Sequence, residues 1–339
     1  GMALANAGVI PHTSPVHEGV YLLAVPYAIV LVILASRLGD LKKAGKWLVV
    51  CFLIAAAGSF LGGVVASQIF HGWIGPETWK LGGAFAAAFV GGGMNFAAVG
   101  RGLQVSPDLF AAASVADNLS TVPWLLAQVG LYRVLTPVYR PFPESMSSGE
   151  AGEEGVGVDP REYWTSTSMN VTDMAILAAI PLGALWLSRK LSPLLPGFPE
   201  VLWLTTFALI VAQTPAVQRL KGAAVLSYFS LHLFFIVVGA NSDVGAVVRA
   251  GPTLFLFMIS IIVLHGLVIY GSGWLLGLDL RIVTLASQAA VGGPGSAMAL
   301  SMAMRWEQLV TPGIIIGIFG YAIGNYLGFA CSYLLRAIL

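Results

Sequence analysis

The sequence predicts an all-α polytopic membrane protein with inverted structural repeats, and three observations support this. First, 57% of its 339 residues are hydrophobic and only 10% are charged, with a mean hydropathy of +0.84. Second, the apolar residues gather in runs long enough to cross a bilayer as helices. Third, glycine clusters interrupt two of these runs, at matching places in the two halves of the chain.

This composition excludes several classes of protein. A soluble domain is roughly half apolar and about a quarter charged, and its core could not hide this much apolar surface. A net charge of +1 creates no field that would attract nucleic acid. Cys51 and Cys331 lie inside apolar runs and are expected as packing residues, without a disulfide or metal. We therefore expect the lipid bilayer as a partner, no nucleic acid and no organic cofactor.

A run of about 20 apolar residues can span the membrane as a helix. The expected segments, in chain order, are 19–37, 45–70, 80–104, 108–137, 171–189, 199–216, 222–240, 252–277, 281–304 and 308–337. The basic residues between 37 and 46 place that loop on the cytoplasmic side. Segment 199–216 is short and has basic residues on both flanks, so it either re-enters the membrane without crossing or shifts the count by one.

The chain divides into two halves joined by a polar stretch. Residues 1–137 form the first expected repeat, with a broken helix over 80–104. Residues 138–170 are acidic and rich in Gly and Ser, which is typical of an extramembrane linker. Residues 171–339 contain a linking helix and the second repeat, with a broken helix over 281–304.

The two glycine interruptions carry the functional argument. Residues 90–103 read VGGGMNFAAVGRGL and residues 291–305 read VGGPGSAMALSMAMR. Gly costs about 1 kcal/mol and Pro about 3 kcal/mol inside a helix, and unwound backbone at membrane depth persists only when it is buried or lines a wet cavity. Matching interruptions in two repeats are typical of the midplane site of a secondary transporter. The alternative is that small residues only let helices pack closely.

A broken helix presents free N–H groups at one end and free carbonyls at the other. The residues expected to bind a solute there are Gly92, Gly93, Asn95, Gln288, Gly293, Pro294, Ser296 and Asn325. The helix N-termini favour an anionic group on that solute. The amides in the second half have an alternative role, since hydrogen bonds between helices would use the same residue types.

The helix after the first interruption carries a polar face. Ser114, Asp117, Asn118 and Thr121 follow the i, i+3, i+4, i+7 spacing of one helix face. Asp117 is the only carboxylate well inside an apolar segment, and an acid at that depth indicates function because burying it without compensation is costly. With Asn95 these groups supply oxygen ligands for a hard cation such as sodium. The alternative is a protonated Asp117 that is hydrogen-bonded to a neighbour.

These motifs also support a resemblance to a known family. GGGMNFAAVGRGL followed by ADN, and SQAAVGGPGSAMAL followed by VTPGIIIGIFGYAIGNYLG, resemble the YjcL-like family of bacterial and plastid membrane proteins, a family of unknown function. Its members carry apolar segments upstream of the position of Tyr21, so we expect that helices precede this chain. The resemblance implies a bacterial inner-membrane location.

The pattern is more distantly similar to the bile-acid sodium symporters and cation/proton antiporters. That resemblance implies inverted repeats, two crossing broken helices, a homodimer, and a core domain that moves against a dimerisation scaffold. The layout of a Gly-Gly break, an Asn and polar residues on the next helix is matched by Gly91, Gly92, Asn95, Asp117 and Thr121. The second interruption lacks the acidic residue that many of these symporters have there.

We therefore expect a sodium-coupled secondary transporter that moves a small organic solute by an elevator motion, and the helix N-termini favour an anionic solute. The core would comprise 80–137 and 281–337, and the scaffold 19–70 and 199–277. A sodium/proton antiporter that uses Asp117 alone is the alternative. An intramembrane hydrolase that pairs Ser296 with His232 or His265 is a remote one, and we expect no enzyme activity.

Overall fold

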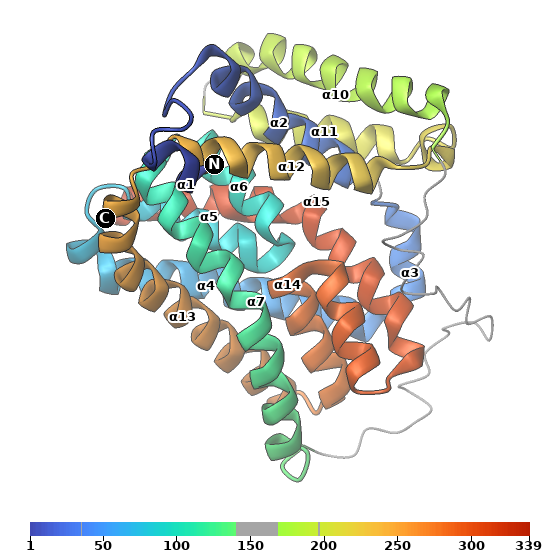
Figure 1. Ribbon diagram of the computed structural model, residues 1–339. Coiled ribbons are helices and arrows are strands. Elements are labelled where there is room, and N and C mark those ends of the chain that lie inside the picture. The colour runs from blue at the N-terminus through green and yellow to red at the C-terminus, as the bar shows by residue number, and fades with distance from the viewer. Residues whose placement is uncertain (35, 140–168, 196) are drawn as a thin grey trace.

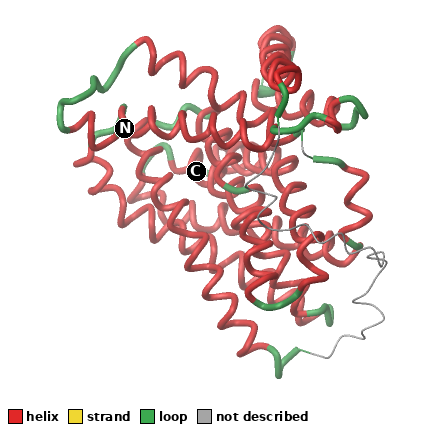
Figure 2. Tube along the Cα trace, turned by 45° about the vertical axis from the view of Figure 1, so that its right-hand side comes forward, coloured by secondary structure: helices red, strands yellow, loops and turns green. Residues whose placement is uncertain are grey.

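The computed structural model describes residues 1–34, 36–139, 169–195 and 197–339. Over these residues the regular structure is helical throughout (Figures 1 and 2). Most of the expected linker, 138–170, lies outside the described residues. Seven of the described helices are long and apolar enough to cross a membrane, namely α2, α4, α7, α10, α12, α13 and α15.

Each expected apolar segment corresponds to a helix or a pair of helices. The helices are α1 (Met2–Asn6), α2 (Pro15–Ile33), α3 (Leu41–Ala44), α4 (Lys46–Ile74), α5 (Thr78–Gly91), α6 (Gly93–Gly102), α7 (Pro107–Leu135), α10 (Val171–Leu191), α11 (Glu200–Ala212), α12 (Ala223–Ala240), α13 (Val244–Leu275), α14 (Leu280–Ala303) and α15 (Glu307–Ile338). The first expected segment is placed four residues late, because Ser14 caps the helix and Pro15 begins it.

Helix α11 is short for a membrane span. Its 13 residues extend about 20 Å at 1.5 Å per residue, whereas the hydrocarbon core of a bilayer is about 30 Å thick. The apolar run from 199 to 216 therefore divides into this helix and a short 3-10 turn at Val217–Arg219. This segment therefore differs from its neighbours in the short length of its helix.

The helices form two layers. Helices α2, α10, α11 and α12 pack on one another in the upper layer of Figure 1, and α4, α5, α7, α13, α14 and α15 pack together below them. Helices α4 and α13 pack closely on each other and on α5, α7 and α14. Helices α4 and α13, which the expected division placed with the scaffold, therefore have buried faces against the interrupted helices.

The backbone leaves the helical conformation at two glycines. Between α5 and α6, Gly92 has φ 74° and ψ −175°; inside α14, Gly293 has φ 71° and ψ −170°. Positive φ of this kind is a conformation that glycine adopts without steric cost. The two interruptions thus share one backbone geometry, although only the second is followed by a proline, Pro294.

Candidate functional site: a cavity beside two helix interruptions

The two interruptions lie on either side of a single tyrosine. A Cβ atom built on Gly92 would lie 3.7 Å from Cε1 of Tyr321, and one built on Gly293 would lie 3.2 Å from the hydroxyl of the same side chain. Tyr321 belongs to α15 and is buried. Segments that are far apart in the sequence therefore meet at one place in the fold, as the matching interruptions predict for a shared site.

Helix α7 passes alongside both interruptions. The Oδ2 atom of Asp117 lies 3.4 Å from the Cβ position of Gly93, the first residue of α6. One turn later, the methyl group of Thr121 lies 2.7 Å from the Cβ position of Gly292. The polar face expected on this helix thus places Asp117 at the first interruption and Thr121 at the second.

The carboxylate of Asp117 is buried and has no partner within the described part of the chain. Its side chain is 7% exposed, and no described residue forms a hydrogen bond or an ion pair with its carboxylate oxygens. Its neighbours use their donors locally, since Ser114 Oγ donates to the carbonyl of Phe110 (2.7 Å) and Asn118 Nδ2 to that of Ser114 (2.7 Å). A buried charge without compensation is costly. Asp117 therefore needs a cation or a proton.

Asn95 and Asn325 form a buried pair instead of facing open space. Asn95 Nδ2 donates to Asn325 Oδ1 (2.9 Å) and to the carbonyl of Tyr321 (3.0 Å). Asn325 Nδ2 in turn donates to Thr205 Oγ1 on α11 (2.9 Å). Both asparagines are nearly inaccessible, at 2% and 1% exposure. The structure thus places these two residues behind the site, where they connect the halves of the chain.

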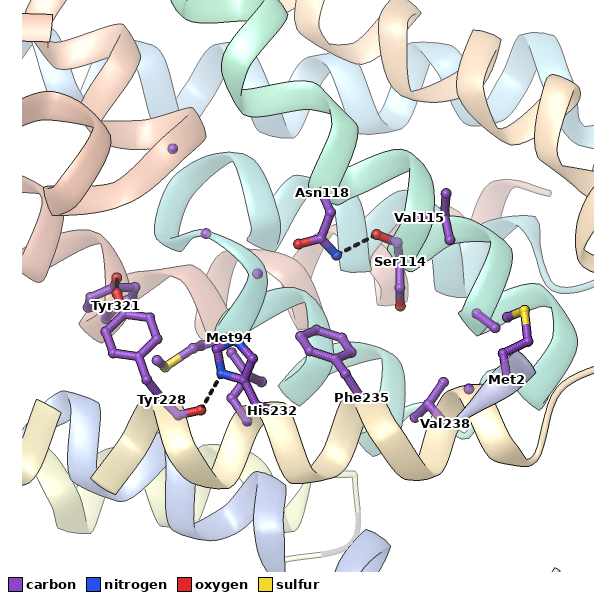
Figure 3. Close-up of a pocket in the computed structure, with 16 residues that line it drawn as sticks. Met2, Met94, Ser114, Val115, Asn118, Tyr228, His232, Phe235, Val238 and Tyr321 are labelled. Carbon is purple, nitrogen blue, oxygen red and sulfur yellow. Dashed lines mark hydrogen bonds between the residues drawn. The ribbon is translucent and has the colours of Figure 1, made fainter. Parts of the chain in front are cut away.

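A cavity of about 450 Å³ lies beside the interruptions, between the two layers (Figure 3). Its wall contains Gly92, Gly93 and Gly292 from the interruptions, Ser114 and Asn118 from α7, Tyr228, His232 and Phe235 from α12, and Tyr321 from α15, together with Met2, Met94, Ala111, Val115, Leu231, Val238 and Gly239. Asp117 does not itself line the cavity, but its Oδ2 atom lies 3.4 Å from the Cβ position of Gly93, which does. A volume of this size is within the range of small-molecule sites in proteins.

Two residues of α14 stay close to the second interruption without lining the cavity. Ser296 Oγ donates to the carbonyl of Gly293 (3.0 Å) and to that of Gln288 (3.3 Å). Gln288 is fully buried, and neither atom of its amide group has a hydrogen-bond partner among the described residues. An unmade hydrogen bond of this kind costs about 1–3 kcal/mol, so a water or a ligand at this position would be favoured.

Neither histidine pairs with Ser296. His232 Nδ1 lies 2.7 Å from the carbonyl of Tyr228 on its own helix, and its side chain faces the cavity (Figure 3). His265 is buried and bonds to two other serines, Ser59 and Ser287. The pair of Ser296 with a histidine that the hydrolase alternative would require is therefore not formed among the described residues.

His265 is the centre of a buried network that the sequence did not reveal. Its Nδ1 lies 2.9 Å from Ser59 Oγ and 3.0 Å from the carbonyl of Ala55, while its Nε2 lies 2.8 Å from Ser287 Oγ. Ser59 Oγ donates to the carbonyl of Phe89 (2.6 Å). A carbonyl only accepts, so Nδ1 carries the ring proton.

The same network extends to α7. Gln128 Nε2 (2.7 Å) and Trp124 Nε1 (3.3 Å) both donate to Ser287 Oγ, whose own proton is then available to Nε2 of His265. Hydrogen bonds therefore run in one direction, from α7 through Ser287 on α14 and His265 on α13 to α4 and the end of α5. Phe89 lies three residues before Gly92, so its carbonyl loses the helical partner that an unbroken α5 would supply.

Comparison with known proteins agrees with the fold. A family model described as "Protein of unknown function (DUF819)" matches residues 1–338. The chain belongs to the DUF819 family. It is also similar to the "Uncharacterized membrane protein YjcL" of Bacillus subtilis (strain 168), with 31% identity over 344 residues that cover 96% of this chain and 85% of the relative. This DUF819 chain is an integral membrane protein in contact with the lipid bilayer, and a bacterial inner-membrane location is consistent with these findings.

Proposed function

We propose that this protein is a secondary active transporter that binds a coupling cation, sodium, at Asp117 and a small organic solute in the adjacent cavity. One observation carries the proposal: a buried carboxylate with no partner among the described residues lies close to two helix interruptions and to a cavity between two layers. Interrupted helices at membrane depth are the usual place for substrate and ion sites in transporters. Oxygen ligands from Asp117, Thr121 and free carbonyls suit sodium.

The packing supports two repeats related by an approximate twofold axis. Counterparts in the two halves pack on each other, α2 on α12 and α4 on α13. The interrupted helix of each half also packs on the last helix of the other half, α5 on α15 and α14 on α7. This exchange of equivalent contacts is what a twofold relation produces, and it is the basis for proposing inverted repeats.

The two layers supply the moving parts. The cavity has α12 on one side and α6, α7, α14 and α15 on the other, so sliding of one layer past the other would carry the site across the membrane. We propose that α2, α10, α11 and α12 are the static scaffold, through which two copies associate as a homodimer. Helices α4 and α13 belong with the moving layer, because they pack on the interrupted helices.

The test is sodium-dependent stability of the purified protein in detergent. Unfolding is followed with a thiol-reactive fluorophore, since Cys51 and Cys331 are both free and buried. Sodium at about 100 times its Kd should add about 2.7 kcal/mol to the free energy of unfolding, and potassium at equal ionic strength should not. Asp117→Asn should abolish the sodium effect.

Asp108→Asn is the matched control. It makes the same acid-to-amide change near the start of α7, where Asp108 Oδ1 accepts from the backbone N–H of Asp243 (3.0 Å). The sodium effect should persist in this variant. Equal stabilisation by sodium and potassium, or a sodium effect that survives Asp117→Asn, would contradict sodium binding at this carboxylate.

The lone carboxylate also favours a second function, sodium/proton exchange. A single buried acid without a partner can bind sodium and a proton in turn. The distinction is made in proteoliposomes that contain no organic solute. Sodium uptake with proton release there supports exchange, whereas uptake that requires a solute supports coupled solute transport.

A further inference from the structure

We infer that the solute bound in this cavity is an organic cation, with an ammonium group at the Asp117 end and an apolar body along α12. The inference rests on the proposed function, because it names the class of solute for the same site, and it makes the coupling an exchange in which sodium and the solute occupy Asp117 in turn. It also reverses the expectation from helix N-termini alone, which favoured an anionic group. The reversal follows from the charges and side chains that surround the two interruptions.

The interruptions themselves contribute little net charge. At Gly92 the C-terminus of α5 meets the N-terminus of α6, and helix ends of about −0.5 and +0.5 largely cancel. At Gly293 the next residue is Pro294, which has no N–H to offer to an anion. When it is ionised, Asp117 adds a negative charge 3.4 Å from the Cβ position of Gly93. The end of the cavity nearest the interruptions is therefore negative.

The rest of the wall has no permanently cationic side chain that would bind an anion. The described residues that line the cavity include no lysine and no arginine, and His232 is the one histidine among them. An organic anion would lose its hydration without gaining a cationic partner, while its charge faced that of Asp117. An ammonium group would instead pair with the buried carboxylate that has no partner.

The remaining surface suits the apolar body of such a solute. Phe235 extends from α12 toward the polar residues of α7, and Tyr228 lies beside Tyr321 at the end near the interruptions, with the two hydroxyls 3.0 Å apart (Figure 3). Aromatic faces attract cations as well as apolar groups. Met94 adds a polarisable thioether to the same wall. The cavity thus has one negative polar end and an aromatic, apolar flank.

The test uses three probes that share a benzyl or phenyl group and differ in charge: benzylammonium, benzyl alcohol and benzoate. Each is added to the purified protein in potassium buffer, and its effect on thermal unfolding is measured. Benzylammonium should raise the Tm well above the values with the other two, and Asp117→Asn should remove that difference. Sodium should raise the apparent Kd for benzylammonium, because both cations use one carboxylate.

Two variants on α12 test the position of the probe. Phe235→Leu keeps an apolar side chain but removes the ring, and should weaken benzylammonium binding roughly tenfold. Phe229→Leu makes the same change at a side chain that is 60% exposed and does not line the cavity, and should leave binding unchanged. Loss of binding in both variants, or in neither, would contradict the placement along α12.

The outcomes separate this inference from the proposed coupling. A sodium-specific shift without a benzylammonium shift overturns the inference and leaves sodium coupling supported. A benzylammonium shift without a sodium effect supports the inference and overturns sodium coupling. Stabilisation by benzoate that equals or exceeds that by benzylammonium, or equal effects of benzylammonium and benzyl alcohol, also overturns it.

Discussion

The contact between α5 and α15 provides a sharp test of the packing, through Gly328→Ala. A Cβ atom at this position would lie 2.6 Å from the Cβ of Ala87, 2.8 Å from the carbonyl oxygen of Gly83 and 2.9 Å from Cγ2 of Val99. Carbon atoms in contact are normally 3.5–4.0 Å apart. Because Ala87 and the Gly83 carbonyl cannot rotate away, the two helices must separate by about 1 Å.

The cost follows from this separation. Overpacking of a tight contact costs about 1–3 kcal/mol, and the gain in helix propensity from Gly to Ala returns up to about 1 kcal/mol. We expect a net loss of about 1–2 kcal/mol in the free energy of unfolding. Gly271→Ala in α13 is the matched control, because nothing lies within 4 Å of its Cβ position and the propensity gain should stabilise the protein.

The measurement is unfolding in mixed micelles with increasing SDS, followed by far-UV circular dichroism. The expected order of stability is Gly271→Ala, then the unsubstituted protein, then Gly328→Ala. If Gly328→Ala were as stable as the unsubstituted protein, the close approach of α5 and α15 would be refuted. The placement of the first interruption against α15 would then be wrong as well.

Two further predictions concern buried and bridging side chains. His265→Ala should lower the free energy of unfolding by about 3–5 kcal/mol, because it leaves a cavity and two buried serine hydroxyls without their histidine partner. The control, His232→Ala, should change the free energy of unfolding by less than about 0.5 kcal/mol. Similar losses of stability for the two variants in the SDS titration would argue against the His265 network. Tyr228→Phe and Tyr321→Phe each remove one hydroxyl of a pair, 3.0 Å apart, that joins the two layers. A double-mutant cycle on the free energy of unfolding should give a coupling energy of about 1 kcal/mol. If the two single losses of stability simply add in the double variant, the hydroxyl pair is not formed.

Membrane location and helix positions followed from the sequence because both depend on local composition. Apolar runs of sufficient length can only become helices in a bilayer, so each expected segment has a counterpart. The boundaries depended on capping and were missed by several residues, as at Ser14. The sequence also placed the non-helical backbone correctly at Gly92 and Gly293, because glycine clusters are costly within a helix.

The individual roles of the polar residues could be predicted only in part. The face that contains Asp117 and Thr121 followed from helical spacing, and the structure places both at the interruptions. Asn95 and Asn325 were expected to face a ligand, but Asn95 donates to Asn325, which in turn donates to Thr205. Spacing along one helix shows which residues share a face, and it does not show what another helix presents to that face.

The sequence by itself thus determined a helical membrane protein, the places where two helices are interrupted and the acid beside one of them. Only the tertiary structure decided that both interruptions meet at Tyr321, that the hydrogen-bond network around His265 joins five helices, and that aromatic residues of α12 complete a cavity. The physical reason is the range of the interactions. Helix formation and its interruption depend on neighbours within a few residues, whereas the site is formed by side chains from segments that lie far apart in the chain and meet only after packing.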